Sequence, residues 1–235
     1  MYYGMYDWTY LLVIVGFIFT MIASSGVKAT FNKYSTVSNA RGLTGAQAAR
    51  QILDANGLRN IRLEHIQGSL TDHYSPKEGV IRLSDSTYNS QSIGAIGVAA
   101  HECGHAIQHK VGYVPIKVRN GIVPFVNVCN RLSMPLFIIG MIMGGRYNSG
   151  YSLAMIGALL FGAVFLFQLV TLPAETNASK RALETIKSMG MLEGSDYDGA
   201  KKVLIAAAMT YVAAVASTAL QFLRLLILAN RNRRN

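Results

Sequence analysis

Two histidines and a glutamate stand close together in the segment VAAHECGHAIQH, residues Val98 to His109. His101 and His105 are four residues apart, and Glu102 follows the first of them. On an α-helix, residues four apart lie on one face, so both imidazoles can reach a single ion. Zn²⁺ favours imidazole nitrogens in a near-tetrahedral shell. The spacing therefore predicts a metal site for Zn²⁺.

Glu102 lies about 100° around the helix from His101, so its carboxylate can flank an ion without binding it. Zinc lowers the pKa of water towards neutrality, and a neighbouring carboxylate can then accept the proton. We therefore predict that Glu102 is the catalytic base of a hydrolytic site. Gly104 would let another backbone segment or a substrate approach closely, and Cys103 is predicted to be a core residue.

A hydrolytic zinc site also needs a third protein ligand and an open position. His109 is a poor candidate, because three ligands along one helix drift around it and would span about 12 Å. Glu175 is distinctive because it directly follows an apolar stretch and lies at the start of a polar helix. A favourable charge at a helix N-terminus is the alternative explanation for it. The other downstream acids are Glu184, Glu193, Asp196 and Asp198.

The composition indicates a membrane protein. Of the 235 residues, 51% are hydrophobic and 14% are charged, against about 25% charged in a typical soluble domain. A helix needs roughly 20 apolar residues to cross about 30 Å of hydrocarbon. Three uncharged stretches are this long: Trp8–Val27, which lacks a basic leader and is predicted to be an anchor, Tyr151–Leu172 and Val203–Leu223.

A fourth stretch, Gly121–Gly145, is interrupted by polar residues. We predict that it also spans, because a helix entering from about Ile116 can bury those groups against protein. Two spans then separate His105 from Glu175. An even number of spans returns the chain to the same side of the membrane, where the two side chains can meet.

The net charge of +10 does not indicate nucleic-acid binding, because the basic residues are scattered and form no basic-aromatic motif. Basic residues beside spans more often set topology and meet anionic lipid. Most of them predict a cytoplasmic catalytic side, although the basic tail, with Arg231, Arg233 and Arg234, would then lie outside. The loop residues in question are Lys28, Lys33, Lys117, Arg119, Lys180, Arg181, Lys201 and Lys202, against Arg146 between the middle spans.

Local patterns predict the elements that must position the motif. Helices are expected at Thr44–Asn56, Ser92–Val111 and Pro173–Met189, the last with Pro173 at its first position. Short strands are expected at Ile61–His65 and Val80–Leu83.

Four segments resemble the bacterial neutral zinc metallopeptidases of the YugP type: GLTGAQAARQIL, DHYSPKEGVIRLSDSTY, AAHECGHAIQH and LPAETNASKRAL. More distantly, the order of spans is similar to that of the HtpX and CAAX-processing membrane gluzincins. In those enzymes a glutamate on a later helix is the third ligand, and an aspartate follows four residues on. Glu175 matches that glutamate, but Ser179 stands in place of the aspartate. Ser179, Asn177 or another residue is then expected to orient a ligating histidine.

The resemblance implies a peptidase with His101, His105 and Glu175 as zinc ligands, where the spacing by itself indicates a zinc hydrolase. In gluzincins a strand edge beside the motif helix pairs with an extended substrate. Val80–Leu83 could be that edge or an ordinary strand. Candidates for stabilising the oxyanion are Tyr88, Arg181 and His109.

Together these inferences predict a mainly α membrane protein with about four transmembrane helices and a small α+β zincin-like layer at the membrane surface. The expected parts are an anchor (1–27), a water-facing zincin-like region (28–120), a membrane hairpin (121–172), a helix carrying the third ligand (173–202), and a last membrane helix with a basic tail (203–235). The expected activity is zinc-dependent endoproteolysis of membrane-associated proteins or peptides in a bacterial cell membrane. A zinc hydrolase of non-peptide bonds and a membrane scaffold with a residual metal site are the alternatives.

Overall fold

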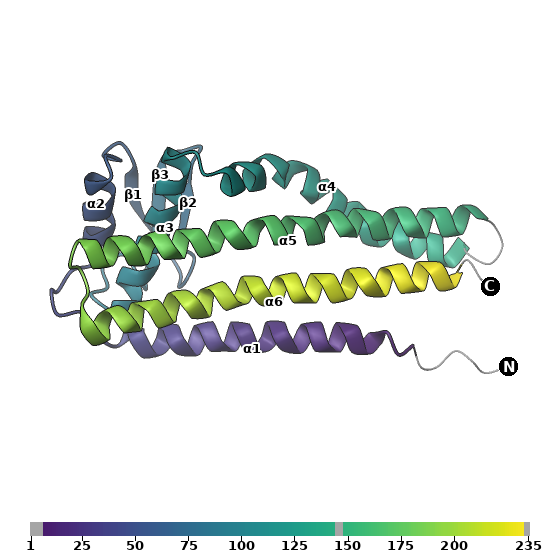
Figure 1. The fold of residues 1–235 in the computed structure, drawn as a ribbon, viewed down its shortest axis with the longest axis horizontal. Helices are drawn as coiled ribbons and strands as arrows, with labels where there is room; N and C mark the ends of the chain where they lie inside the picture. Colours follow the sequence, from purple (N-terminus) through teal and green to yellow (C-terminus); the bar gives the residue numbers. More distant parts are fainter. Residues whose placement is uncertain (1–6, 144–147, 233–235) are drawn as a thin grey trace. The chain divides into compact units, whose positions relative to one another are not determined.

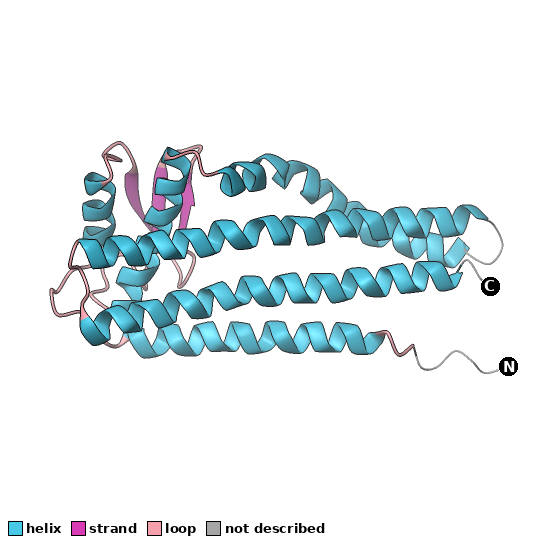
Figure 2. Ribbon diagram, viewed as in Figure 1, coloured by secondary structure: helices cyan, strands magenta, loops and turns pink. Residues whose placement is uncertain are grey.

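The computed structural model describes residues 7–143 and 148–232 (Figure 1). Residues 144 and 145, the last two of the predicted span Gly121–Gly145, lie outside the described residues. Strands occur in the described residues only as a small three-stranded sheet (Figure 2). The predicted mainly helical architecture with a small sheet is confirmed. The elements are α1 (Tyr10–Ser35), α2 (Gly45–Ala55), β1 (Arg62–Ile66), β2 (His73–Ser75), β3 (Val80–Ser84), α3 (Ile93–Lys110), α4 (Val114–Met143), α5 (Asn148–Ser188) and α6 (Gly194–Asn232).

The chain divides into two compact units. The helical unit comprises Met1–Ile22, Val118–Leu172 and Tyr211–Asn235, and the sheet-containing unit comprises Ala23–Lys117 and Pro173–Thr210. The helices α1, α4, α5 and α6 each contribute residues to both units. The predicted chemical residues, His101, Glu102, His105 and Glu175, all belong to the sheet-containing unit.

Four helices, α1, α4, α5 and α6, are long and apolar enough to cross a membrane. They contain all of Tyr151–Leu172 and Val203–Leu223, most of Trp8–Val27, and the interrupted stretch from Gly121 to Met143, which is part of α4. Large apolar side chains lie on the outside of these helices: Phe17 is 62% exposed, Ile142 is 79% exposed and Leu159 is 58% exposed. Such a surface is unfavourable in water and matches the hydrocarbon core of a bilayer.

Small residues hold α4 and α5 together inside the helical unit. A β-carbon on Gly157 would lie 2.5 Å from the backbone nitrogen of Phe137, and one on Gly140 would lie 2.2 Å from that of Ala154. No side chain fits at either distance, so glycine allows the two backbones to approach. This is the kind of contact by which membrane helices associate without a hydrophobic driving force.

Pro173 does not begin a new helix as predicted. It lies inside α5, which runs without a break from Asn148 to Ser188. Proline removes one backbone hydrogen bond, but helices that cross membranes tolerate this because neighbouring groups satisfy the freed carbonyl. The apolar stretch before Pro173 and the polar stretch after it are therefore two parts of one helix, and Glu175 lies just beyond the apolar part.

The sheet has the strand order β1-β3-β2, with β1 parallel and β2 antiparallel to β3. The strands predicted at Ile61–His65 and Val80–Leu83 correspond to β1 and β3. However, β3 is the central strand and both of its edges are paired, so the interpretation of Val80–Leu83 as an exposed edge is wrong. Val80, Ile81 and Leu83 are fully buried, as expected of a strand with neighbours on either side.

The helix α3 forms the centre of the sheet-containing unit and packs against α2, β2 and β3. Ser92 caps its N-terminus by accepting a hydrogen bond from the Ala95 amide, as Thr44 does for α2 in a capping box with Gln47. The predicted core position of Cys103 is correct, because its side chain is fully buried and its thiol donates to the carbonyl of Ala49.

Candidate metal centre

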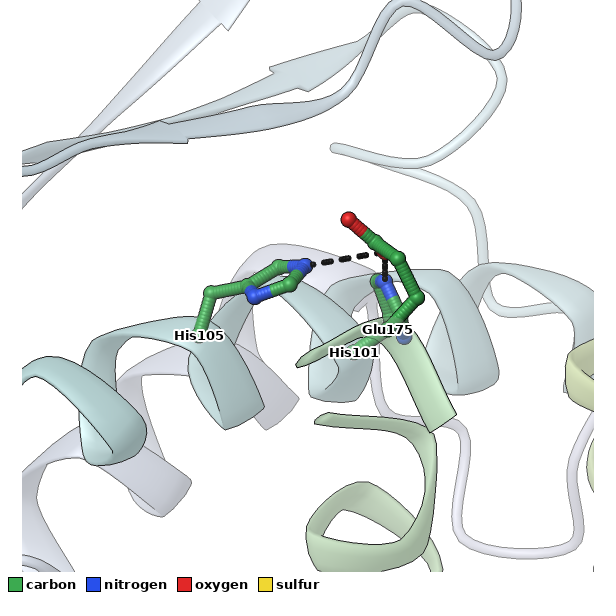
Figure 3. Close-up of side chains that lie close together, drawn as sticks. All are labelled: His101, His105 and Glu175. Atoms are coloured by element: carbon green, nitrogen blue, oxygen red, sulfur yellow. Dashed lines mark ion pairs between the residues drawn. The ribbon is translucent and has the colours of Figure 1, made fainter. Parts of the chain in front are cut away.

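The two motif histidines present their Nε2 atoms to one carboxylate oxygen. His101 and His105 lie one turn apart on α3, and each Nε2 is 3.3 Å from Oε2 of Glu175 on α5 (Figure 3). The three side chains offer ligand atoms that all lie within 4.8 Å of one another. Within the described ranges, no other histidine, cysteine or acid joins this group.

The other acids and histidines considered as third ligands have different partners. Glu184 is exposed and forms an ion pair with Lys180 at 3.8 Å. The His109 ring meets Tyr74 edge-on, with 6.3 Å between the ring centres. Asp196 accepts a hydrogen bond from the Ala40 amide. Neither Glu193 nor Asp198 belongs to the group that could hold an ion. Glu175 is therefore the acid that the fold brings to the two histidines.

A close approach of the α3 and α5 backbones brings Glu175 to the two histidines. A β-carbon on Gly104 of α3 would lie 2.5 Å from the carbonyl oxygen of Ala178 on α5. Only glycine allows this contact. Ala178 lies between Glu175 and Ser179 along α5, so the approach brings both of those side chains to the histidines. The prediction that Gly104 admits another backbone segment is confirmed.

Each histidine has a hydrogen-bonding partner on its other ring nitrogen. Nδ1 of His101 lies 3.1 Å from the hydroxyl of Ser179, and Nδ1 of His105 lies 3.0 Å from Oε1 of Gln108. Because Nδ1 is engaged in both rings, Nε2 is the nitrogen left to face an ion. Ser179 thus occupies the place that the more distant resemblance to the HtpX and CAAX-processing gluzincins assigns to an aspartate, with a neutral hydroxyl in place of a carboxylate.

The amide of Gln108 determines which nitrogen of His105 carries the proton. Its Nε2 donates to the carbonyl of Ala174 at 2.7 Å and to Oδ1 of Asn177 at 3.0 Å. A carbonyl can only accept, so Oε1 of Gln108 must be the atom that faces His105. His105 then donates from Nδ1, and its Nε2 keeps a lone pair for a metal. Gln108 is fully buried and was not singled out from the sequence, although it lies three residues after His105 on the same helix.

The electrostatics of the group favour a charged carboxylate. Burial alone would raise the pKa of Glu175, but hydrogen bonding and charge from His101 and His105 hold it below its ordinary value. Burial likewise opposes protonation of His105, whereas the interactions with Glu175 and Glu102 raise its pKa. A carboxylate that is ionised and 2% exposed calls for a positive partner, and a divalent cation at this position would supply one.

Glu102 lies beside the group without belonging to it. Its side chain is 8% exposed, and in the described parts of the chain no hydrogen bond or ion pair engages it. A carboxylate without such partners is available to accept a proton from a neighbouring molecule.

The three residues proposed to bind the oxyanion have other contacts. Arg181 donates to Oδ1 of Asn177 at 2.8 Å and lies over the ring of Tyr113. The ring of Tyr88 lies 5.2 Å from that of His65, and His109 contacts Tyr74.

The donor set fits zinc. Two neutral imidazole nitrogens and one carboxylate oxygen are ligands that zinc prefers, and three protein ligands leave one coordination position open. Histidines that bind a metal through one ring nitrogen usually form a hydrogen bond through the other, as His101 and His105 do through Nδ1.

Comparison with known proteins agrees with this chemistry. Residues 9–230 match a protein family described as "Putative neutral zinc metallopeptidase". The chain belongs to this family. It is also 44% identical to "Putative membrane protease YugP" of Bacillus subtilis (strain 168). The alignment extends over 220 residues and covers 90% of this chain and 96% of that protein. No solved structure matches the chain. Membership confirms the predicted resemblance, zinc as the cofactor and a metalloprotease of the membrane.

Proposed function

We propose that the chain is an integral-membrane zinc endopeptidase that hydrolyses peptide bonds in membrane-associated proteins or peptides. His101, His105 and Glu175 hold the metal, and Glu102 is the catalytic base and then the proton donor. The observation that carries the proposal is the convergence of both Nε2 atoms on one buried glutamate oxygen, with an unengaged carboxylate beside them.

A zinc ion held by these residues supplies a Lewis acid that lowers the pKa of water and polarises a peptide carbonyl. Glu102 accepts the proton of the attacking water and passes it to the nitrogen of the leaving amine. Ser179 and Gln108 keep the two imidazoles in the orientation and tautomer that face the ion.

The outer edge of β2 is the surface best suited to hold a substrate backbone. β2 is an edge strand, because only one side of β2 is paired, and that side is paired with β3. β2 also packs against the motif helix α3. An extended peptide can add to such an edge through main-chain hydrogen bonds, which gives affinity with little dependence on sequence. β2 then has the role in substrate binding that the family resemblance suggested for Val80–Leu83.

The site opens near the membrane surface on the cytoplasmic side. Glu175 is only three residues beyond the apolar stretch that ends at Leu172, so a substrate must approach the bilayer. Most basic residues in the loops beside the spans lie on the side of the site, with the basic tail as the exception, and such loop residues remain in the cytoplasm. The chain therefore crosses the membrane four times, with the sheet-containing unit inside the cell.

The test compares Glu102→Gln with the parent protein and with Glu184→Gln. Glu184 is an exposed acid paired to a lysine, so its substitution controls for loss of one carboxylate. Zinc content is measured on purified full-length protein, and a peptide library is digested and read by mass spectrometry. We expect Glu102→Gln to keep its zinc and lose about 100-fold or more of the peptidase rate, while Glu184→Gln behaves like the parent.

Three outcomes contradict the proposal. A zinc-loaded Glu102→Gln protein that still cleaves peptides would remove Glu102 from the chemistry. A zinc-loaded parent that cleaves esters or other non-peptide substrates but no peptide would favour the alternative hydrolase. A Glu102→Gln chain that fully replaces the parent in cells would favour a scaffold.

A further inference from the structure

A groove between α1 and α6 in the sheet-containing unit combines an apolar floor with two lysines. Its volume is about 460 Å³, and its floor includes Ala29 on α1 and Ile205 and Ala206 on α6. Lys33 from α1 and Lys202 from α6 also line it. We propose that this groove binds an anionic phospholipid, with the phosphate at the two lysines and an acyl chain along the apolar floor.

The position of the groove along its helices is that of a lipid headgroup. The uncharged stretch of α1 ends at Val27 and that of α6 begins at Val203. The lining residues therefore lie within two helical turns of the points where both helices leave the hydrocarbon. A basic site between helices at this depth can meet a phosphate while its apolar part faces the acyl chains.

Two lysines and no acid are among the residues that line the groove. Lys33 Nζ lies 5.6 Å from the ring centre of Tyr34, which also lines the groove. That ring packs against Gly199, where a β-carbon would lie 2.8 Å from it, so the ring is held between α1 and α6. In the described parts of the chain neither Lys33 nor Lys202 forms an ion pair, not even with Asp198, one turn before Lys202.

A second groove nearby lacks this arrangement. It is lined by Lys180 and Glu184 on α5 together with Tyr197 and Ile205 on α6. Its lysine already has an acidic partner, because Lys180 pairs with Glu184. Both grooves are mostly apolar, so charge is what distinguishes the proposed phospholipid site.

The test uses two double variants with the same net charge. Lys33→Gln/Lys202→Gln removes the lysines of the groove. Lys28→Gln/Lys201→Gln removes exposed lysines from the same two helices at the same membrane boundary, outside the groove. Binding of phosphatidylglycerol and of phosphatidylcholine with identical acyl chains is titrated on the full-length protein in detergent by native mass spectrometry.

We expect the parent and Lys28→Gln/Lys201→Gln to prefer phosphatidylglycerol. Each groove lysine removed should weaken its binding about five-fold. Binding of phosphatidylcholine should fall much less, because its choline cation offsets the charge of the phosphate. If both double variants lose phosphatidylglycerol binding equally, general surface charge and not a specific site would account for the binding. Equal binding of the two lipids by the parent, or displacement of phosphatidylglycerol by the same concentration of inorganic phosphate, would also overturn the proposal. Unchanged thermal unfolding of both variants serves as the folding control.

Discussion

Gly104 and Ala178 form a tight packing contact beside the proposed metal site. A β-carbon on Gly104 would lie 2.5 Å from the carbonyl oxygen of Ala178, which is too close for any side chain. The contact joins the motif helix α3 to α5, three residues after Glu175 and one before Ser179. The absence of a side chain at one position therefore determines how near two functional groups come to the histidines.

Gly104→Ala should consequently damage both stability and the metal site. Overpacking of a tight contact costs about 1–3 kcal/mol, and the strain is relieved only if α5 moves away with Glu175. We expect a lower unfolding temperature and faster loss of zinc to a chelator. Gly121→Ala is the matched control, because a β-carbon there meets nothing within 4 Å. A Gly104→Ala protein as stable and as zinc-retentive as the parent would show that this contact does not determine the position of Glu175.

Gln108→Met should weaken metal binding without removing a ligand. Methionine approximates the size of glutamine but offers no amide to hold Nδ1 of His105 or to satisfy the carbonyl of Ala174. Loss of such a supporting hydrogen bond typically costs about 10–100-fold in metal affinity. Competition of the purified variant against a zinc chelator measures the change, and His109→Gln, one residue further on, should match the parent. If Gln108→Met binds zinc as tightly as the parent, Gln108 only fills space.

The group of His101, His105 and Glu175 could be predicted because it depends on local spacing and on simple counting. His101, Glu102 and His105 lie on one helix, and the two predicted spans between His105 and Glu175 indicated that these two side chains could meet. Gln108 was not predictable in the same way. Its role depends on the carbonyl of Ala174 and on Asn177, which reach it only through the packing of α5 on α3.

The errors in the fold have the same origin. β2 has three residues, too few for an alternating pattern to indicate a strand, and its pairing to β3 makes β3 central. Pro173 was interpreted by a local rule for helix starts, whereas the apolar residues before it and the polar residues after it both continue the helix. Long-range pairing and helix continuity are not contained in short windows of sequence.

Asp85 should stabilise the loop between β1 and β2 in a pH-dependent way. Hydrogen bonds from the Gly68 amide at 2.8 Å and from His65 at 2.6 Å hold the pKa of Asp85 below its ordinary value. A lowered pKa in the folded state gives stability that is present above the unfolded value and is lost as the pH falls through the folded one. The loop also contains Leu70, with a φ of 57°, which needs such support.

Asp85→Asn should therefore speed hydrogen exchange at residues 67–72 several-fold at neutral pH, where the parent carboxylate is charged. Once the pH lies below the pKa of Asp85, the parent and the variant should exchange alike. Asp54→Asn, which removes an equivalent charge from α2, should leave these amides unchanged. If the exchange rates of the parent and Asp85→Asn differ by the same factor at every pH, the shape of the side chain and not its charge would account for the difference.

The proposed orientation predicts which introduced cysteines can be labelled from outside the cell. Ser69 is exposed in the sheet-containing unit and Ser149 is exposed at the start of α5. The proposed topology puts them on opposite sides of the membrane, because one proposed span, α4, lies between them. An impermeant maleimide should label Ser149→Cys in intact cells, and Ser69→Cys only after permeabilisation. The native Cys103 and Cys129 are buried and should give little background. The reverse pattern would place the catalytic side outside.

Glu175→Ala should lose zinc far more readily than Glu184→Ala or His109→Ala. Two imidazoles hold the ion weakly, and the charged oxygen of Glu175 strengthens binding while leaving one position open. Glu184 is nine residues further along α5, about 14 Å away by the helical rise, and pairs with Lys180. His109 contacts Tyr74 and lies outside the group. Zinc content after mild chelation, measured on the three purified variants, separates these possibilities. Retention of zinc by Glu175→Ala, together with its loss from either of the other two, would mean that the third ligand is a different residue.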